Sequence, residues 1–164
     1  MAEEEQSLIT DEMRATVGKE SSPHTLEIER GAIRQYARAA GYANPVYYDL
    51  EAARAAGHPD LPAPPGFLGR HPFLPGVSDP TFSAPMEGSV LRNPKLTRNL
   101  NGGQGVKQTR RLYAGEKLTM TSAIVNYAER TGSIGRMLIT TSQSTYRDEK
   151  GEVVARENFT GIAY

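Results

Sequence analysis

Apolar and polar residues alternate with two different periods in the first third of the chain. Residues 25–29, Thr-Leu-Glu-Ile-Glu, alternate at every second position, which predicts a short β-strand. The following segment has the period of a helix, and Gly41 then ends the pattern at a position where glycine adopts positive φ without strain. One face of this predicted helix carries apolar residues at i, i+3, i+4 and i+7: Ile33, Tyr36, Ala37 and Ala40.

A second, shorter helix is predicted immediately after a polar loop. Asp49 stands at the N-cap position before residues 50–56, Leu-Glu-Ala-Ala-Arg-Ala-Ala, which are strong helix formers. Gly57 is the stop signal, and Pro59 reinforces it. Residues 61–67, Leu-Pro-Ala-Pro-Pro-Gly-Phe, then predict a stiff turn, because each proline fixes its own φ.

The C-terminal half has the composition and turn spacing of β-strands. Four segments rich in Thr, Val, Ile and Tyr are separated by glycine-containing turns, and we expect them to form a four-stranded meander: residues 104–113, 117–127, 137–146 and 153–163. A strand and a helix followed by a meander predict an α+β fold, a curved antiparallel sheet wrapped around a helix.

The two remaining regions are harder to assign from pattern alone. Glycine and proline cluster between residues 57 and 103 with apolar residues between them, which predicts a long ordered loop. Its many prolines allow only short helical pieces over residues 68–100. Residues 1–23 predict a partly flexible lead ahead of a single domain at 24–164. Within that lead, residues 7–10 either begin a short helix or belong to a mobile terminus.

Composition excludes several classes of function. The chain has 164 residues, enough for one domain with its own core, and 19 basic residues balance 19 acidic ones. This balance argues against nucleic-acid or membrane-surface partners. There is no cysteine, and the three histidines lack metal-ligand spacing, so we expect no metal site. The acidic start and the lack of a long apolar run predict a cytoplasmic protein.

Several segments in a fixed order resemble the MaoC-like hydratase and dehydratase superfamily. The resemblance covers residues 24–164 and is closest to the dehydratase domain related to type I fatty acid synthase, the N-terminal half of hydratases with two hot-dog domains. It implies a single hot-dog fold. The matching segments are Pro45-Val46-Tyr47-Tyr48-Asp49, Ala63-Pro64-Pro65-Gly66-Phe67, Leu100-Asn101-Gly102-Gly103-Gln104 and Tyr113-Ala114-Gly115-Glu116-Lys117-Leu118.

The resemblance also implies that this chain lacks the usual catalytic dyad. Active members of the superfamily carry Asp-x-Asn-Pro-[Ile/Val]-His, and here Tyr42 stands at the aspartate and Tyr47 at the histidine, around Asn44-Pro45. A phenol with a pKa near 10 is a poor base at neutral pH. We therefore expect a non-catalytic, substrate-shaping subunit of a hetero-oligomeric enoyl-CoA hydratase or dehydratase. Its partner would be a catalytic MaoC-like hot-dog subunit.

The same resemblance implies which residues contact the substrate. The substrate would be an acyl-CoA, a coenzyme A thioester, and no further cofactor is expected. The residues expected to line the acyl tunnel are Tyr42, Asn44, Tyr47, Pro65, Gly66 and Phe67.

Other readings of these residues stay open. The chain could be a stand-alone hydratase that uses Tyr42, Tyr47 or His58, the last beside Asp60. It could also be a binding module for acyl-CoA or another protein, without lyase activity. The tyrosines could be ordinary half-buried residues, and Asn44 could serve only the turn. A basic set could meet coenzyme A phosphates or form a solvated patch: Arg92, Lys95 and Arg98.

Overall fold

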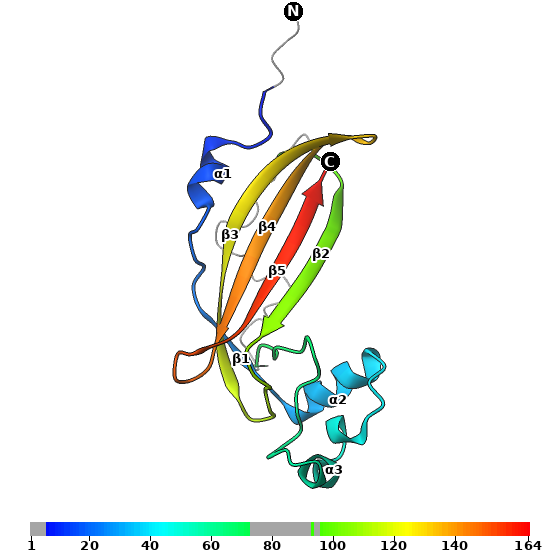
Figure 1. Ribbon diagram of the computed structural model, residues 1–164. Helices are drawn as coiled ribbons and strands as arrows, with labels where there is room; N and C mark the ends of the chain where they lie inside the picture. The colour runs from blue at the N-terminus through cyan, green and yellow to red at the C-terminus, as the bar shows by residue number, and fades with distance from the viewer. Residues whose placement is uncertain (1–5, 73–92, 94–95) are drawn as a thin grey trace, which may run out of the picture.

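A computed structural model of the chain shows a long curved sheet with short helices at one end and along one side (Figure 1). The structure describes residues 6–72, 93 and 96–164. The elements in chain order are α1 (Asp11–Thr16), β1 (His24–Glu27), α2 (Arg30–Ala39), the 3₁₀ turn η1 (Pro45–Tyr47), α3 (Leu50–Ala55), β2 (Asn99–Gln108), β3 (Lys117–Gly132), β4 (Gly135–Arg147) and β5 (Val153–Ala163).

The predicted curved antiparallel sheet is confirmed, but its strand order differs from a simple meander. The order is β1-β3-β4-β5-β2, so β3, β4 and β5 form a meander while β2 pairs with β5. The prediction of a four-stranded meander is therefore wrong for β2. Its place beside β3 is taken by β1, which pairs with the start of β3 in the register Glu27↔Lys117.

The strand predicted at 104–113 forms at 99–108 instead. Beyond it, the backbone pairs with the proline-rich turn: Ala63 N–H donates to the Leu112 carbonyl at 2.8 Å, and Ala114 N–H donates to that of Leu61 at 3.0 Å. Arg110 and Arg111 consequently lie outside the strand. The long-range pairing of residues 112–114 with 61–63 overrides the local strand preference.

Both predicted helices form where their capping residues place them. The C-terminus of α2 is a Schellman motif: Gly41 has φ of +76°, and Tyr42 N–H donates to the Ala37 carbonyl at 2.9 Å. The Asp49 side chain caps α3 by accepting from Ala52 N–H at 2.7 Å, and Gly57 ends that helix with φ of +86°. The strand predicted at 25–29 is β1, which starts one residue earlier and ends two earlier.

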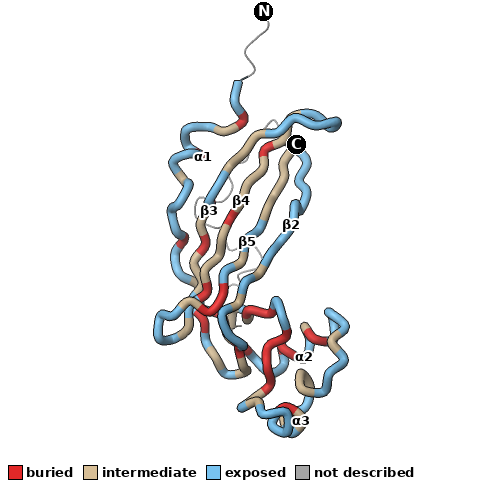
Figure 2. Tube along the Cα trace, viewed as in Figure 1, coloured by how far each residue is buried: buried red, intermediate tan, exposed pale blue. Residues whose placement is uncertain are grey.

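The main core joins α2 to the end of the sheet where β3 and β5 begin. Ile33 on α2 is fully buried and shares one apolar cluster with Leu61, Leu112, Leu118 and Val154. Figure 2 shows that buried residues concentrate at this end, whereas β2 is largely exposed. Within the described residues, the sheet therefore extends well beyond the end that packs against α2.

The described part of the N-terminal lead packs against the other end of the sheet. Thr10 caps α1 by accepting from Met13 N–H at 3.2 Å, which confirms the short-helix alternative for the described part of the lead. Leu8 and Met13 pack with Leu138 in a second apolar cluster.

The long-loop region is described only in part. Residues 68–72 and 96–98 contain no helix, and the other predicted helical pieces fall at 73–92 and 94–95, outside the described residues. Among the described helices, none is long and apolar enough to cross a membrane.

Candidate functional site

The candidate site is the loop that follows α2, residues 41–49. Two caps fix its backbone, since Gly41 ends α2 and the Asn44 side chain accepts from Val46 N–H at 3.1 Å to start η1. Tyr48 braces the loop from within, because its hydroxyl donates to the Tyr42 carbonyl at 2.7 Å. Arg34 on α2 donates to the Tyr48 carbonyl at 2.8 Å. The loop is thus held rigidly against α2.

Tyr42 and Tyr47 meet at the centre of this loop. Their ring centroids lie 5.6 Å apart with an interplanar angle of 56°, and both side chains are half-buried. Within the described residues neither hydroxyl forms a hydrogen bond, whereas Tyr36, Tyr48 and Tyr146 all donate theirs. The pair therefore presents two unused phenols on an apolar aromatic surface.

Asn44 acts on the backbone of the loop in this structure. Its side-chain oxygen caps η1 through Val46 N–H, the structural role that the sequence left as an alternative. The carboxylate of Asp49 is likewise engaged in capping α3. Both side chains thus stabilise the backbone of this loop.

The proline-rich turn packs against Tyr36 of α2. Pro65 and Gly66 are exposed, but Phe67 is only 4% exposed and belongs to the main core. The Phe67 ring lies 5.3 Å from that of Tyr36, whose hydroxyl donates to the Pro65 carbonyl at 3.4 Å. Among the six residues expected to contact the acyl group, Phe67 is thus the one whose side chain the core buries.

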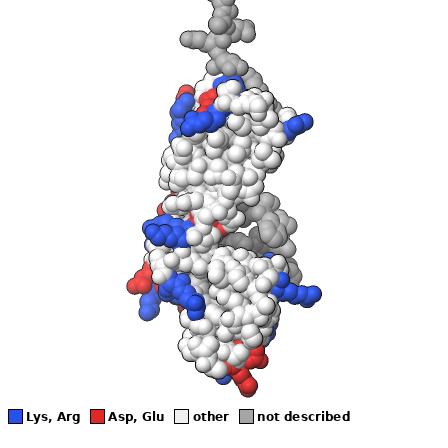
Figure 3. All heavy atoms as spheres, turned by 45° about the vertical axis from the view of Figure 1, so that its right-hand side comes forward, with Lys and Arg blue, Asp and Glu red and all other residues white. Residues whose placement is uncertain are grey.

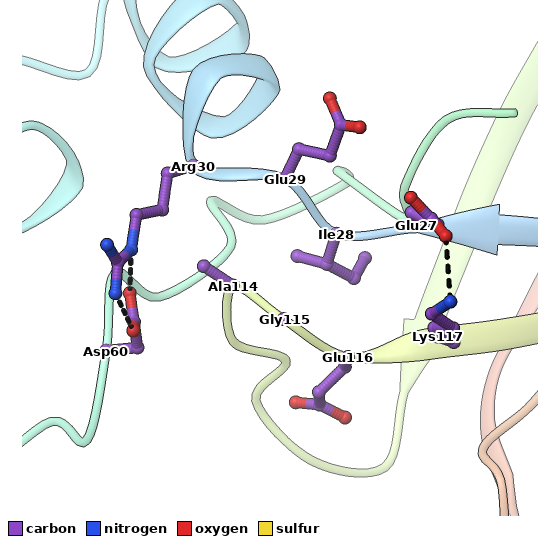
Figure 4. A pocket seen from close by; sticks show the side chains of 9 residues that line it. All are labelled: Glu27, Ile28, Glu29, Arg30, Asp60, Ala114, Gly115, Glu116 and Lys117. Atoms are coloured by element: carbon purple, nitrogen blue, oxygen red, sulfur yellow. Dashed lines mark hydrogen bonds and ion pairs between the residues drawn. The ribbon is translucent and has the colours of Figure 1, made fainter. Parts of the chain in front are cut away.

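A hollow of about 520 Å³ lies at the other end of α2, where β1 leads into the helix (Figure 4). Neither Tyr42 nor Tyr47 is among the residues that line this hollow. Its lining is Glu27, Ile28, Glu29, Arg30, Asp60, Ala114, Gly115, Glu116 and Lys117.

Charge in this hollow is arranged in pairs. The guanidinium of Arg30 donates two hydrogen bonds to the carboxylate of Asp60, at 2.9 and 2.6 Å. The ammonium of Lys117 lies 3.0 Å from the carboxylate of Glu27. The hydrogen bond from Arg30 holds the pKa of Asp60 below its usual range. The lining has four carboxylates and two cations, and Arg110 from outside it binds the carboxylate of Glu116 at 2.7 Å. Both cations of the lining are thus already engaged by carboxylates.

His58 and Asp60 do not form the acid/base pair considered from the sequence. Asp60 is bound to Arg30, while His58 Nε2 lies 3.3 Å from an Arg111 nitrogen and Nδ1 lies 3.5 Å from the Tyr113 hydroxyl. Arg111 can only donate, so Nε2 of His58 accepts in this arrangement. Among the described residues there is also no group of three histidine, aspartate or glutamate side chains suited to a metal ion.

A polar cluster on the sheet was not predicted from the sequence. Tyr146 on β4 donates to Glu157 on β5 at 2.6 Å, and Gln104 on β2 also donates to Glu157. Burial, followed by the bond to Glu157, raises the pKa of Tyr146 above its usual value, so its phenol is a neutral donor. The three residues come from three strands, and no local motif marks them.

Comparisons with known proteins agree with this architecture. The family model described as "FAS1-like, dehydratase domain region" matches residues 15–157. A relative from Streptomyces coelicolor, "UPF0336 protein SCO4636", is 37% identical over 146 residues, covering 86% of this chain and 87% of the relative.

Two solved complexes from Mycobacterium tuberculosis share the fold. The ChsH1-ChsH2 complex matches with a TM-score of 0.68 and 20% identity, covering 95% of this chain and 90% of the matched one. The HadBC (3R-Hydroxyacyl-ACP Dehydratase) complex matches with a TM-score of 0.64 and 21% identity, covering 94% of this chain and 98% of the matched one. These similarities confirm the predicted hot-dog fold.

Proposed function

Because the chain belongs to the FAS1-like dehydratase domain family, we propose that it is a non-catalytic, substrate-shaping subunit of a hetero-oligomeric enoyl-CoA hydratase or dehydratase. The reaction would be the reversible addition of water to a 2-enoyl thioester. The observation that carries the proposal is the contact between Tyr42 and Tyr47 at the dyad positions. This loop presents two phenols where proton transfer to and from water needs a carboxylate and an imidazole.

The proposed partner is a catalytic hot-dog subunit that supplies the missing dyad. The outer edge of β2 supports this pairing, because within residues 6–72, 93 and 96–164 no backbone segment pairs with it. Its ten residues include a single charge, Lys107. Figure 3, with the β2 side turned forward, shows a broad surface with few charged side chains. An unpaired strand edge that carries few charged side chains favours addition of another strand.

The names of the structural neighbours point the same way. ChsH1-ChsH2 and HadBC are both complexes of two different chains, and HadBC is named as a 3R-hydroxyacyl-ACP dehydratase. In the proposed assembly, Tyr42 and Tyr47 would form part of the wall that the acyl group contacts. The substrate would carry its own coenzyme A, and the reaction needs no metal or redox cofactor.

The test is to assay the chain with and without its partner. The partner would be obtained by co-purification from the native host, and hydration of crotonyl-CoA would be followed for each chain and for the mixture. We expect negligible turnover by this chain alone and substantial turnover by the complex. Turnover by the isolated chain would favour the stand-alone hydratase, and acyl-CoA binding without turnover in the complex would favour a binding module.

The interface is tested with a substitution that the chain itself can accommodate. A Cβ at Gly105 in β2 would meet no atom within 4 Å, so Gly105→Glu adds a charge to the strand without an internal clash. We expect it to weaken the complex at least tenfold while leaving the melting temperature nearly unchanged. Gly31→Glu is the matched control, since Gly31 is equally unobstructed but lies in α2. Equal affinities for the two variants would contradict pairing through β2.

A further inference from the structure

The two outer edges of the sheet differ in how far other segments of the chain cover them. β1 pairs with only the first four residues of β3, which leaves most of that sixteen-residue strand with an outer edge. Residues 6–21, here called the N-terminal strap, run along this edge (Figure 1). The opposite edge, on β2, has no such cover among the described residues.

The strap is bound to β3 through backbone hydrogen bonds near its C-terminal end. Gly18 N–H donates to the Ile124 carbonyl and Ser21 N–H to that of Ser122, each at 2.8 Å. Glu20 also forms an isolated antiparallel bridge with Ala123. These contacts use the groups through which another strand would join β3.

An apolar cluster and one carboxylate hold the rest of the strap. Met13 is 1% exposed and Leu8 is 6% exposed, and both pack against the sheet. The carboxylate of Glu129 on β3 accepts from the Ser7 hydroxyl, from Leu8 N–H at 2.9 Å and from Ile9 N–H at 3.3 Å. Backbone, apolar and charged contacts thus fix one short segment along one edge.

We propose that the N-terminal strap is an edge guard that prevents a second copy of this chain from pairing with β3. With the strap in place, β2 is the one sheet edge that the described residues leave unpaired along its length, so assembly stops at a closed pair. With the strap released, each chain has two pairing edges, and copies can add without closure. The occupant of the released edge is a second copy, because the exposed β3 backbone offers the same unpaired groups as the β2 edge. This inference rests on the sheet edges and does not require the proposed enzymatic role.

The experiment releases the strap in the full-length chain. Leu8→Asp combined with Met13→Asp places two charges in the buried cluster, and Val17→Asp is the matched control because Val17 is 43% exposed. Hydrogen exchange at the amides of Gly18 and Ser21 reports release, and light scattering after gel filtration reports mass. We expect the double variant to at least double in mass with rising concentration, and the control to keep the wild-type mass.

A reversible lock separates edge pairing from general aggregation. The chain has no cysteine, so Glu20→Cys with Ala123→Cys introduces the only thiols, across positions already bridged. In the released variant this disulfide should restore the wild-type mass, and a reducing agent should restore growth. If release is complete and the mass stays unchanged, or if the locked protein grows equally, the proposal is wrong. Should the double variant not fold, Glu129→Ala releases the first part of the strap alone and is tested in the same way.

Discussion

Tyr42 and Tyr47 lie in contact with ring centroids 5.6 Å apart, and within the described residues neither phenol is hydrogen-bonded. Their hydroxyls therefore contribute little to stability, while their rings shape the surface of the loop. If the two tyrosines form a wall for the acyl group, as proposed, their hydroxyls should be dispensable for turnover.

Tyr42→Phe and Tyr47→Phe should each change the free energy of unfolding by less than about 0.5 kcal/mol. Tyr48→Phe is the matched comparison, because it removes the 2.7 Å bond to the Tyr42 carbonyl, and it should cost about 0.5–1.5 kcal/mol. Urea unfolding of the three variants checks the order. Turnover of the complex should survive both Tyr42→Phe and Tyr47→Phe, and its loss in either one, with assembly intact, would make that tyrosine catalytic.

Phe67→Ala should act mainly through the core. Because Phe67 is 4% exposed and packs on Tyr36, the cavity left behind should cost about 3–5 kcal/mol. The measurement is thermal unfolding alongside activity of the complex on short and bulky enoyl thioesters. A uniform loss that tracks the melting temperature fits a core residue. A selective gain on bulky substrates at unchanged stability would instead place Phe67 in the acyl tunnel.

Local patterns predicted the helices and the turn of the candidate site well. The cap at Asp49 and the stop at Gly41 are read from neighbours within a few residues, and both are confirmed. The same is true of the Asn44-Pro45 turn that brings Tyr42 near Tyr47. Each of these features is stabilised by contacts that are close in sequence. The predicted helical face is buried at Ile33 and Ala37, whereas Ala40 is exposed just beyond the end of α2.

Pairing choices and distant contacts could not be predicted in this way. Composition and turn spacing indicate a strand near residue 104, but they do not show that this strand joins β5 instead of β3. The bond between Leu8 and Glu129 joins residues 121 positions apart, and neither residue is unusual in its local context. His58 similarly meets Arg111 only because the proline-rich turn pairs with residues 112–114.

Gly66→Ala should be destabilising for two separable reasons. Gly66 has φ of +84°, and a Cβ there would lie 2.9 Å from the Tyr36 hydroxyl. The strained backbone should cost about 1–2 kcal/mol, and the contact should add to it. In the Tyr36→Phe background the contact disappears, so the cost of Gly66→Ala should fall without vanishing. A double-mutant cycle measured by urea unfolding checks this, and an unchanged cost would mean that the contact is relieved by rotation of Tyr36.

The attachment of the N-terminal strap should weaken at acidic pH. The hydrogen bond from Ser7, with further bonds from Arg136 and the amides of Ile9 and Leu8, lowers the pKa of Glu129. A carboxylate whose pKa is lower in the folded state stabilises that state at neutral pH. This contribution is lost as the pH falls through the usual range of glutamate and then through the lowered pKa, from about pH 5 downward.

The strap must be observed locally, because Asp60 and Asp148 also have lowered pKa values and weaken the whole fold in the same range. We expect the amides of Leu8 and Ile9 to exchange faster below about pH 5, once the rates are corrected for the intrinsic pH dependence of exchange. This change should come at a higher pH than global unfolding. Glu129→Gln should raise exchange at neutral pH and flatten the acid dependence at these amides. Glu12→Gln, which changes an exposed glutamate of the same segment, should do neither. If Glu129→Gln left the acid response of the strap intact, another group would have to hold the strap on β3.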